Sequence, residues 1–246
     1  MRFKLEFILK DEYFPLDYHK TFISFIKKSL QEYESGKHFN KYYNSQLSEN
    51  NMKKFSWSVN LISPKFEKNH IKVEGKKIIV TFVDPDRLSS FIMFSAFSKQ
   101  TGKPFKVSKD NEMTLEKVAV GRNREVTGNI VHFKTYSPIA LRMHCRESNK
   151  DKYITVEDEG FISELKNSLQ KEFPEFSSEI KRIKIDLSGM KKQVVPLFGQ
   201  MIDVSIGDFL VEGDKNLLKK LHENSIGSRK SAGFGVLNVE YSWELI

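Results

Sequence analysis

A histidine between basic and aromatic residues is the first candidate for chemistry in this sequence. His38 lies in the segment GKHFNKYYN, with Lys37 and Lys41 around it and Tyr42 and Tyr43 close behind. Histidine is suited to proton transfer near neutral pH, because its unperturbed pKa is about 6.5. A lysine can neutralise phosphate charge, and a tyrosine can hydrogen-bond an oxygen or stack on a base. The alternative is an ordinary exposed loop histidine, with the two tyrosines as core aromatics.

The glycine-rich segment IGSRKSAGFG, residues 226–235, is the second candidate. Glycines allow positive φ and close backbone approach, and the residues between them add hydroxyl groups and cations. A dinucleotide or Walker loop follows a strand and opens a helix, whereas a helix is expected before this segment and a strand after it. We therefore predict a phosphate-contacting loop for a polyanion, or else a helix C-cap at Gly227. The predicted contacts are Gly227, Ser228, Arg229, Lys230, Ser231, Gly233 and Gly235.

The net charge also favours an anionic partner. The 40 Lys and Arg residues against 32 Asp and Glu give a formal net charge of +8 at pH 7. Positive charge is concentrated in residues 36–80 and 97–150, where it indicates a basic surface for nucleic acid. A charged surface kept for solubility is the alternative explanation.

Signals for metals, cofactors and export are missing from the sequence. It contains no H-E-x-x-H, C-x-x-C or G-x-S-x-G motif. His144 and Cys145 are adjacent in an expected strand and point to opposite faces, which argues against a metal shared with His132. Cys145 is the only cysteine, which favours a reducing compartment, and no apolar run approaches the length of a membrane span. We expect a cytoplasmic protein without metal, cofactor or membrane partner.

The spacing of apolar residues predicts the elements that position these candidates. In residues 1–124 it predicts strands at 2–9, 55–62, 77–83, 105–107 and 114–120, and helices at 16–33 and 88–97. In residues 125–246 it predicts strands at 130–136, 139–143, 180–187, 200–211 and 236–243, and helices at 161–173 and 215–222. Lys191 and Lys192 then fall in a turn. The order β-α-β-β-α-β occurs twice, which predicts the α+β class with two ferredoxin-like domains, 1–124 and 125–246.

The C-terminal half resembles a known superfamily. A helix, then IGSRKSAGFGVLNV, then a final strand resembles the C-terminal motif of CRISPR-associated RAMP proteins. More narrowly, the chain is similar to the repeat-RNA-processing endoribonucleases of the Cas "six" family. The segments VHFKTYSPIALRM and IDLSGMKKQVVPLFGQMIDVSIGDFLVEG resemble the opening and the central hairpin of that family's second half. The resemblance implies a tandem ferredoxin-like, RRM-like fold, binding of CRISPR precursor RNA, and cleavage within each repeat without a metal.

The resemblance also implies roles for particular residues. Metal-free RNA cleavage needs a base for the 2′-OH, an acid for the leaving 5′-oxygen, and a group that stabilises the phosphorane. Family enzymes place the working histidine just after the first helix, which is the position of His38 here. Lys191 and Lys192 either contact the RNA backbone or keep a hairpin soluble. The predicted helpers of His38 are Tyr43 and Lys41, with Tyr42, Lys37 and Tyr33 as alternates.

Two other functions remain open at this point. One is a non-catalytic RAMP-type subunit that holds guide RNA in a CRISPR effector complex, and the other is a small-molecule enzyme on a ferredoxin-like scaffold. For an RNA-binding protein the expected partner is CRISPR repeat RNA. Further effector-complex subunits and a homodimer are compatible with the sequence. The histidine segment and the glycine-rich loop are expected to contact one RNA.

Overall fold

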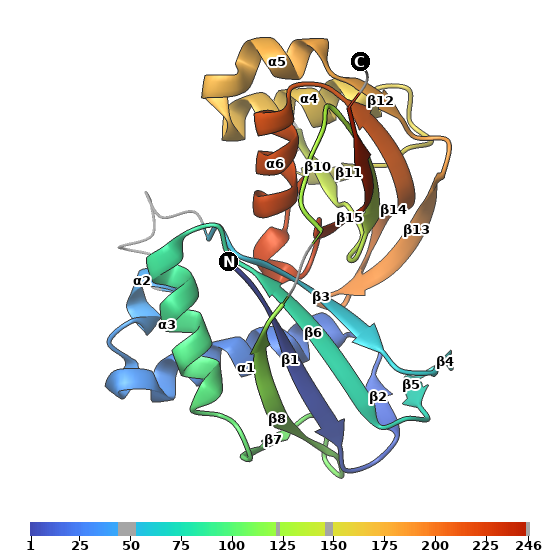
Figure 1. Ribbon diagram of the computed structural model, residues 1–246. Coiled ribbons are helices and arrows are strands. Elements are labelled where there is room, and N and C mark those ends of the chain that lie inside the picture. The colour runs from blue at the N-terminus through green and yellow to red at the C-terminus, as the bar shows by residue number, and fades with distance from the viewer. Residues whose placement is uncertain (44–52, 122–123, 146–149, 245–246) are drawn as a thin grey trace. The chain divides into compact units, whose positions relative to one another are not determined.

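The computed structural model describes residues 1–43, 53–121, 124–145 and 150–244. The chain divides into two compact units, which are labelled by element in Figure 1. Unit 1 contains Met1–Gly121 and Pro196–Gln200, and unit 2 contains Arg122–Val195 and Met201–Ile246. No helix in the described part of the chain is long and apolar enough to cross a membrane.

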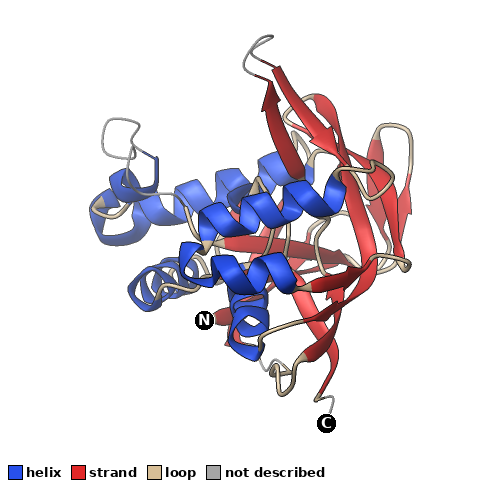
Figure 2. Ribbon diagram, turned by 90° about the horizontal axis from the view of Figure 1, so that it is seen from above, coloured by secondary structure: helices blue, strands red, loops and turns tan. Residues whose placement is uncertain are grey.

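Unit 1 is built on one antiparallel sheet with the strand order β3-β6-β1-β8-β7. When β1, β3, β6 and β8 are numbered one to four along the chain, their order in the sheet is 2-3-1-4, which is the ferredoxin-like arrangement. The strands are β1 (Arg2–Leu9), β3 (Ser56–Leu61), β6 (Lys77–Val83), β7 (Pro104–Lys106) and β8 (Glu112–Val120). The main helices are α1 (Tyr18–Glu32) and α3 (Arg87–Ser98), drawn in blue in Figure 2.

Alternating residues of β1 join this sheet to the helices. Phe7 lies 5.7 Å from Phe22 and 5.1 Å from Phe25 of α1, measured between ring centroids. Phe3 contacts Phe97 of α3 at 6.0 Å. These rings are almost fully buried, and burial of each aromatic side chain contributes roughly 1.5–3 kcal/mol. The alternation read in the sequence is therefore the core-facing side of the strand.

Smaller elements complete unit 1. A left-handed turn, Tyr33–Gly36, follows α1, and the short helix α2 (Phe39–Tyr43) comes after it. A three-stranded sheet contains β2 (Tyr13–Pro15), β5 (His70–Val73) and β4 (Pro64–Phe66), paired in that order. The sequence did not predict this sheet, because strands of three or four residues are too short for a clear alternation.

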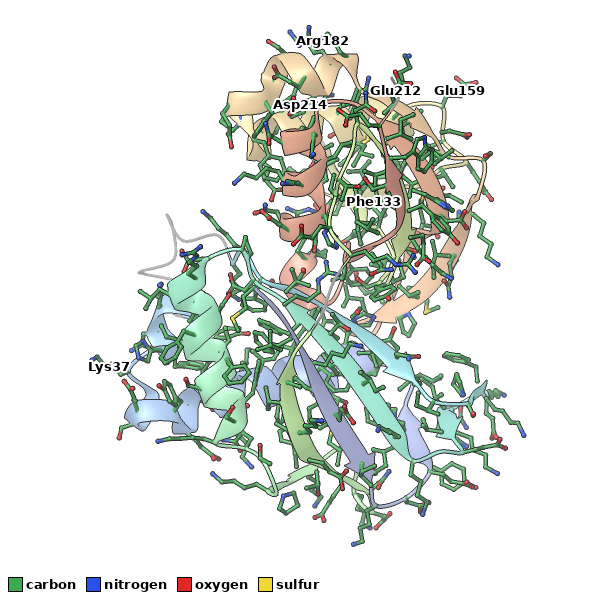
Figure 3. The ribbon with its side chains drawn as sticks, in the orientation of Figure 1. Lys37, Phe133, Glu159, Arg182, Glu212 and Asp214 are labelled. Atoms are coloured by element: carbon green, nitrogen blue, oxygen red, sulfur yellow. The ribbon has the colours of Figure 1, made fainter. Side chains whose placement is uncertain are left out.

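Unit 2 repeats the arrangement with the strand order β12-β14-β9-β15. Its strands are β9 (Ile130–Thr135), β12 (Lys184–Asp186), β14 (Gln200–Glu212) and β15 (Leu237–Trp243), with β13 (Met190–Leu197) paired to β14. The helices are α4 (Phe161–Glu172), α5 (Ser177–Arg182) and α6 (Lys215–Asn224). Phe133 of β9 is fully buried in this core (Figure 3). Each unit therefore has the ferredoxin-like order, and the predicted α+β fold is confirmed.

A separate hairpin in unit 2 pairs β10 (Leu141–Cys145) with β11 (Lys150–Ile154). Only β10 was predicted. The register places Arg142 opposite Tyr153 and His144 opposite Asp151. Directly opposed residues of an antiparallel pair share a face, so these four side chains lie on one side of the hairpin.

Two predicted features of residues 180–192 are wrong. Residues 180–187 are not one strand, since α5 continues to Arg182 and only Lys184–Asp186 forms β12. Ile180 and Ile183 are both buried, and their spacing of three suits a helical turn better than a strand. Lys191 and Lys192 are not in a turn, because β13 begins at Met190. Pro196 lies inside β13, which is compatible with a strand paired on one side.

Candidate functional site

The segment that carries His38 is a sharp reversal at the end of α1. Glu34 and Ser35 have φ values of 45° and 55°, and Gly36 follows at 79°. A left-handed backbone costs an L-residue roughly 1–2 kcal/mol, and only glycine adopts it freely. Lys37 comes next, exposed, with its side chain pointing away from the ribbon (Figure 3). This reversal turns the chain back so that His38 lies beside the residues that end the helix.

His38 has two close partners from that reversal. Its Nε2 lies 3.1 Å from Oε2 of Glu34, and its ring stacks on Tyr33 with centroids 5.8 Å apart. Lys99 at the end of α3 places its Nζ 5.5 Å from the Tyr33 ring. The His38 side chain remains 22% exposed. A histidine that is oriented by its neighbours but still reachable has the geometry that proton transfer requires.

The carboxylate of Glu34 fixes the roles of the ring nitrogens. The hydrogen bond from His38 is the main cause that lowers the pKa of Glu34 below its ordinary value, and a hydrogen bond from Tyr33 adds to this effect. An ionised carboxylate only accepts hydrogen bonds, so Nε2 of His38 must donate. In the neutral ring the lone pair is then on Nδ1, which is the atom able to take a proton.

Tyr42 belongs to the core of unit 1. It is 6% exposed, and its hydroxyl lies 2.6 Å from Oγ of Ser89. Ser89 donates to Oδ2 of Asp84 at 2.5 Å, so Tyr42 is the donor to Ser89. Burial raises the pKa of Asp84. Of the two interpretations given for Tyr42, the structure favours the core aromatic, and its hydroxyl joins α2 to the start of α3.

Tyr43 and Lys41 contact residues other than His38. Tyr43 stacks on Phe39 with centroids 5.3 Å apart, and Nζ of Lys53 lies 4.0 Å from its ring centroid. Burial raises the pKa of Tyr43 well above its ordinary value. Lys41 is exposed, with Nζ 5.8 Å from the Tyr42 ring. The helper roles of Tyr43 and Lys41 stay predictions, while the alternate Tyr33 is the tyrosine that contacts His38.

Glu34 is the residue of this site that sequence reasoning missed. It precedes His38 by four residues, with Ser35, Gly36 and Lys37 between them. An acid four residues from a histidine suggests an interaction only on a helix, and this segment was expected to lie after the helix. The unusual left-handed run produces the contact instead.

The glycine-rich loop of unit 2 is held tightly against β10. Ser228 N donates to Ala140 O at 2.7 Å, and Ile226 N donates to Gly235 O at 3.0 Å. Gly227 has a φ of 84°, and a Cβ there would meet Ala140 O at 2.7 Å. At Gly235 a Cβ would meet Ile226 O at 1.9 Å. The glycines are therefore required by close backbone approach, which is a structural use that does not depend on a bound ligand.

The two cations of the loop differ in their surroundings. Lys230 forms an ion pair with Glu172, and its side chain is 14% exposed. Arg229 is 38% exposed, with Nη2 3.3 Å from Oδ2 of Asp151 and Nε donating to the Tyr153 hydroxyl at 2.9 Å. Arg229 is thus the loop cation that faces solvent, and Lys230 is engaged inside unit 2.

The remaining candidates are surface residues of unit 2. Lys192 pairs with Asp203 at 2.8 Å, which raises the pKa of Lys192, and Lys191 is exposed. His132 pairs with Asp208 at 2.8 Å. Within the described ranges no group of three His, Cys, Asp or Glu side chains is arranged to hold a metal ion. His38 and the glycine-rich loop belong to different units, so their contact with one RNA stays a prediction.

Comparison with known proteins identifies the family. The family model for the C-terminal part of the CRISPR associated protein Cas6 matches residues 121–239, which include the glycine-rich loop. Residues 121–239 belong to the Cas6 C-terminal family. No curated protein matches it by sequence.

Solved structures of Cas6-related and RAMP proteins share its fold over nearly the whole chain. A Cas6-related protein from Pyrococcus furiosus is similar with a TM-score of 0.80 and 20% identity, covering 97% of this chain and 98% of that one. A RAMP protein described as binding different RNA substrates has a TM-score of 0.78 and 17% identity, covering 98% and 100%. A Cas6 product complex has a TM-score of 0.69 and 11% identity, covering 97% and 98%. At these identities the likeness is one of fold.

Proposed function

We propose that this chain is an endoribonuclease that cleaves CRISPR precursor RNA within its repeats, without a metal cofactor. The observation that carries the proposal is His38, oriented by Glu34, stacked on Tyr33 and open to solvent. The match of residues 121–239 to the Cas6 C-terminal family supports the substrate class, and the net charge of +8 suits an RNA partner.

The proposed reaction is an in-line attack within the RNA. The 2′-OH next to the cut site attacks the phosphorus as it loses its proton, and the P–O5′ bond breaks as the 5′-oxygen gains a proton. The products are a 5′-OH end and a 2′,3′-cyclic phosphate, or the 3′ phosphate formed by its hydrolysis. His38 transfers one of these protons through Nδ1, while Glu34 holds the other side of the ring.

A positive charge near the phosphorane would complete the site. Lys41 and Lys37 are exposed near His38 in the chain, and Lys99 lies over the Tyr33 ring. Such a cation stabilises the extra negative charge of the transition state. Tyr43, which is partly buried, remains a proposed helper.

The test is cleavage of repeat RNA in EDTA by the wild-type protein and by His38→Ala. We expect discrete cleavage by the wild type and at least about a hundredfold slower cleavage by the variant, with RNA binding retained. A repeat with 2′-deoxyribose at the cut site should bind and stay intact. Wild-type rates from His38→Ala, or cutting of the deoxy substrate, would refute the mechanism. Binding without any cleavage by the wild type would indicate a non-catalytic RAMP subunit.

A further inference from the structure

A second charged group lies on the β10–β11 hairpin of unit 2, away from His38 in the chain. One carboxylate, that of Asp151, is surrounded by three cationic or potentially cationic side chains. Arg142 Nη1 lies 3.0 Å from its Oδ2, and His144 Nδ1 lies 3.0 Å from its Oδ1. Arg229 reaches the same Oδ2 at 3.3 Å. We call Asp151 with these three partners and Tyr153 the Asp151 cluster.

The backbone explains how these side chains meet. The β10–β11 register places Arg142, His144, Asp151 and Tyr153 on one face of the hairpin. Arg229 comes from the glycine-rich loop, which is fixed beside β10 by the hydrogen bond from Ser228 N to Ala140 O. That approach requires Gly227, and Arg229 itself has a left-handed φ of 59°. Strained backbone of this kind commonly occurs at ligand-binding sites.

The groups around Asp151 are those that bind phosphate. Guanidinium groups hold oxyanions through paired N–H donors, and a histidine N–H adds a third direction. Tyr153 accepts from Arg229 Nε at 2.9 Å and so orients its guanidinium plane. Hydrogen bonds from His144 and Arg142, with the nearby charge of Arg229, hold the pKa of Asp151 below its usual range. Two guanidinium groups against one carboxylate leave the cluster positive.

Resting on the proposed function, we propose that the Asp151 cluster is a binding site for an RNA backbone phosphate, occupied by the Asp151 carboxylate until RNA displaces it. The cluster is accessible, since Arg142 and His144 are 41% and 48% exposed. A hairpin side chain can turn away more readily than a core residue can. Asp151 thereby weakens binding to any single phosphate, and RNA that also contacts other parts of the protein overcomes this competition.

The test is the affinity of Asp151→Asn for repeat RNA, measured by fluorescence anisotropy in EDTA with 2′-deoxyribose at the cut site. Asparagine keeps the size of the side chain and removes the competing charge. We expect about fivefold tighter binding than by the wild type at low salt, because one like charge is removed near the phosphate. Glu212→Gln is the matched control, since it removes one negative charge from an ion pair with Lys184 elsewhere in unit 2.

A second variant keeps the test decisive if Asp151→Asn folds poorly. Arg229→Gln should weaken RNA binding and reduce the slope of log affinity against log salt by about 0.7, the value for one phosphate contact on a single strand. In the double variant with Arg229→Gln and Asp151→Asn, the gain in RNA affinity from the asparagine should be smaller than in Asp151→Asn alone. Folding of each variant is checked by thermal melting.

Several outcomes would overturn the proposal. They are equal affinities of Asp151→Asn and Glu212→Gln, weaker binding by Asp151→Asn when it is folded, an unchanged salt slope in Arg229→Gln, or no RNA binding by any form of the protein. Any of these would make the cluster a structural ion-pair network. Wild-type cleavage by His38→Ala together with the predicted gain in Asp151→Asn would instead refute the catalytic assignment and retain the phosphate site.

Discussion

At the scale of single residues, the placement of His38 depends on its neighbour Glu34. The carboxylate accepts from Nε2 at 3.1 Å and leaves Nδ1 facing away from it. The carboxylate therefore orients the ring and places a negative charge beside it. In the proposed reaction Glu34 is a positioning residue, since it acts through His38.

Replacing Glu34 with Gln separates those two effects. The amide retains a hydrogen-bond acceptor for Nε2 but carries no charge. We expect single-turnover cleavage to slow by about tenfold, because the ring loses the charged partner that holds its orientation. The measurement is the single-turnover cleavage rate of repeat RNA.

Glu32→Gln provides the comparison for that experiment. Glu32 lies at the end of α1 and accepts from Gln100 rather than from His38. The Glu32→Gln variant removes the same charge two residues away, and its cleavage rate should match the wild type. Equal cleavage rates of Glu34→Gln and Glu32→Gln would contradict the positioning role.

At the scale of elements, α2 is fixed through a buried polar chain. The Tyr42 hydroxyl donates to Ser89, which donates to Asp84 at the start of α3. Since α2 directly follows His38, this chain limits how far the histidine segment can move. The sequence around Tyr42 is equally compatible with a tyrosine on the surface and one in the core. The burial of Tyr42 in the structure decides for the core.

Tyr42→Phe removes that hydroxyl while it keeps the buried ring. The free energy of unfolding should fall by about 1 kcal/mol, the usual net value of one hydrogen bond. Urea denaturation measures it, and Tyr13→Phe, at a 46% exposed side chain, is the control. Equal stability of the two variants would show that the hydroxyl does not hold α2 in place.

The glycine-rich loop depends on steric room at Gly235. A Cβ there would meet Ile226 O at 1.9 Å, in addition to a φ of 77°. Gly102 has a similar φ of 75° with nothing within 4 Å of an added Cβ. The Gly102→Ala variant should therefore lose only the free energy of the strained backbone, about 1–3 kcal/mol.

Gly235→Ala should lose clearly more stability than Gly102→Ala, because the loop must open to admit the methyl group. Thermal melting of both variants gives the comparison. The opened loop should also release Ser228 from Ala140 and Arg229 from β11, and so weaken RNA binding. Similar melting temperatures for the two variants would mean that the loop adapts without strain.

At the scale of the whole molecule, the same sheet order occurs in both units with different attached features. Unit 1 carries His38 after its first helix, and unit 2 carries the glycine-rich loop before its last strand. Each unit has its own hydrophobic core. In the proposed function, catalysis belongs to unit 1 and part of the backbone binding to unit 2, so a productive RNA must contact both.

The sequence by itself determined the order of the main helices and strands, the resemblance to the Cas6 family, and the two segments of interest. These follow from local patterns, because alternation, helical spacing and glycine spacing involve residues close together in the chain. Strand β13 was missed, since Pro196 and the lysines obscure its alternation and only pairing with β14 reveals it. The short strands of unit 1 were missed for a similar reason.

Only the tertiary structure decided which side chains meet. Glu34 reaches His38 because three successive residues have a left-handed backbone, and no local sequence pattern predicts that conformation. Arg229 reaches Asp151 across 78 residues of sequence, after the loop and the hairpin have packed together. Such contacts depend on the folded backbone rather than on spacing, so the sequence could name Arg229 but could not supply the carboxylate that faces it.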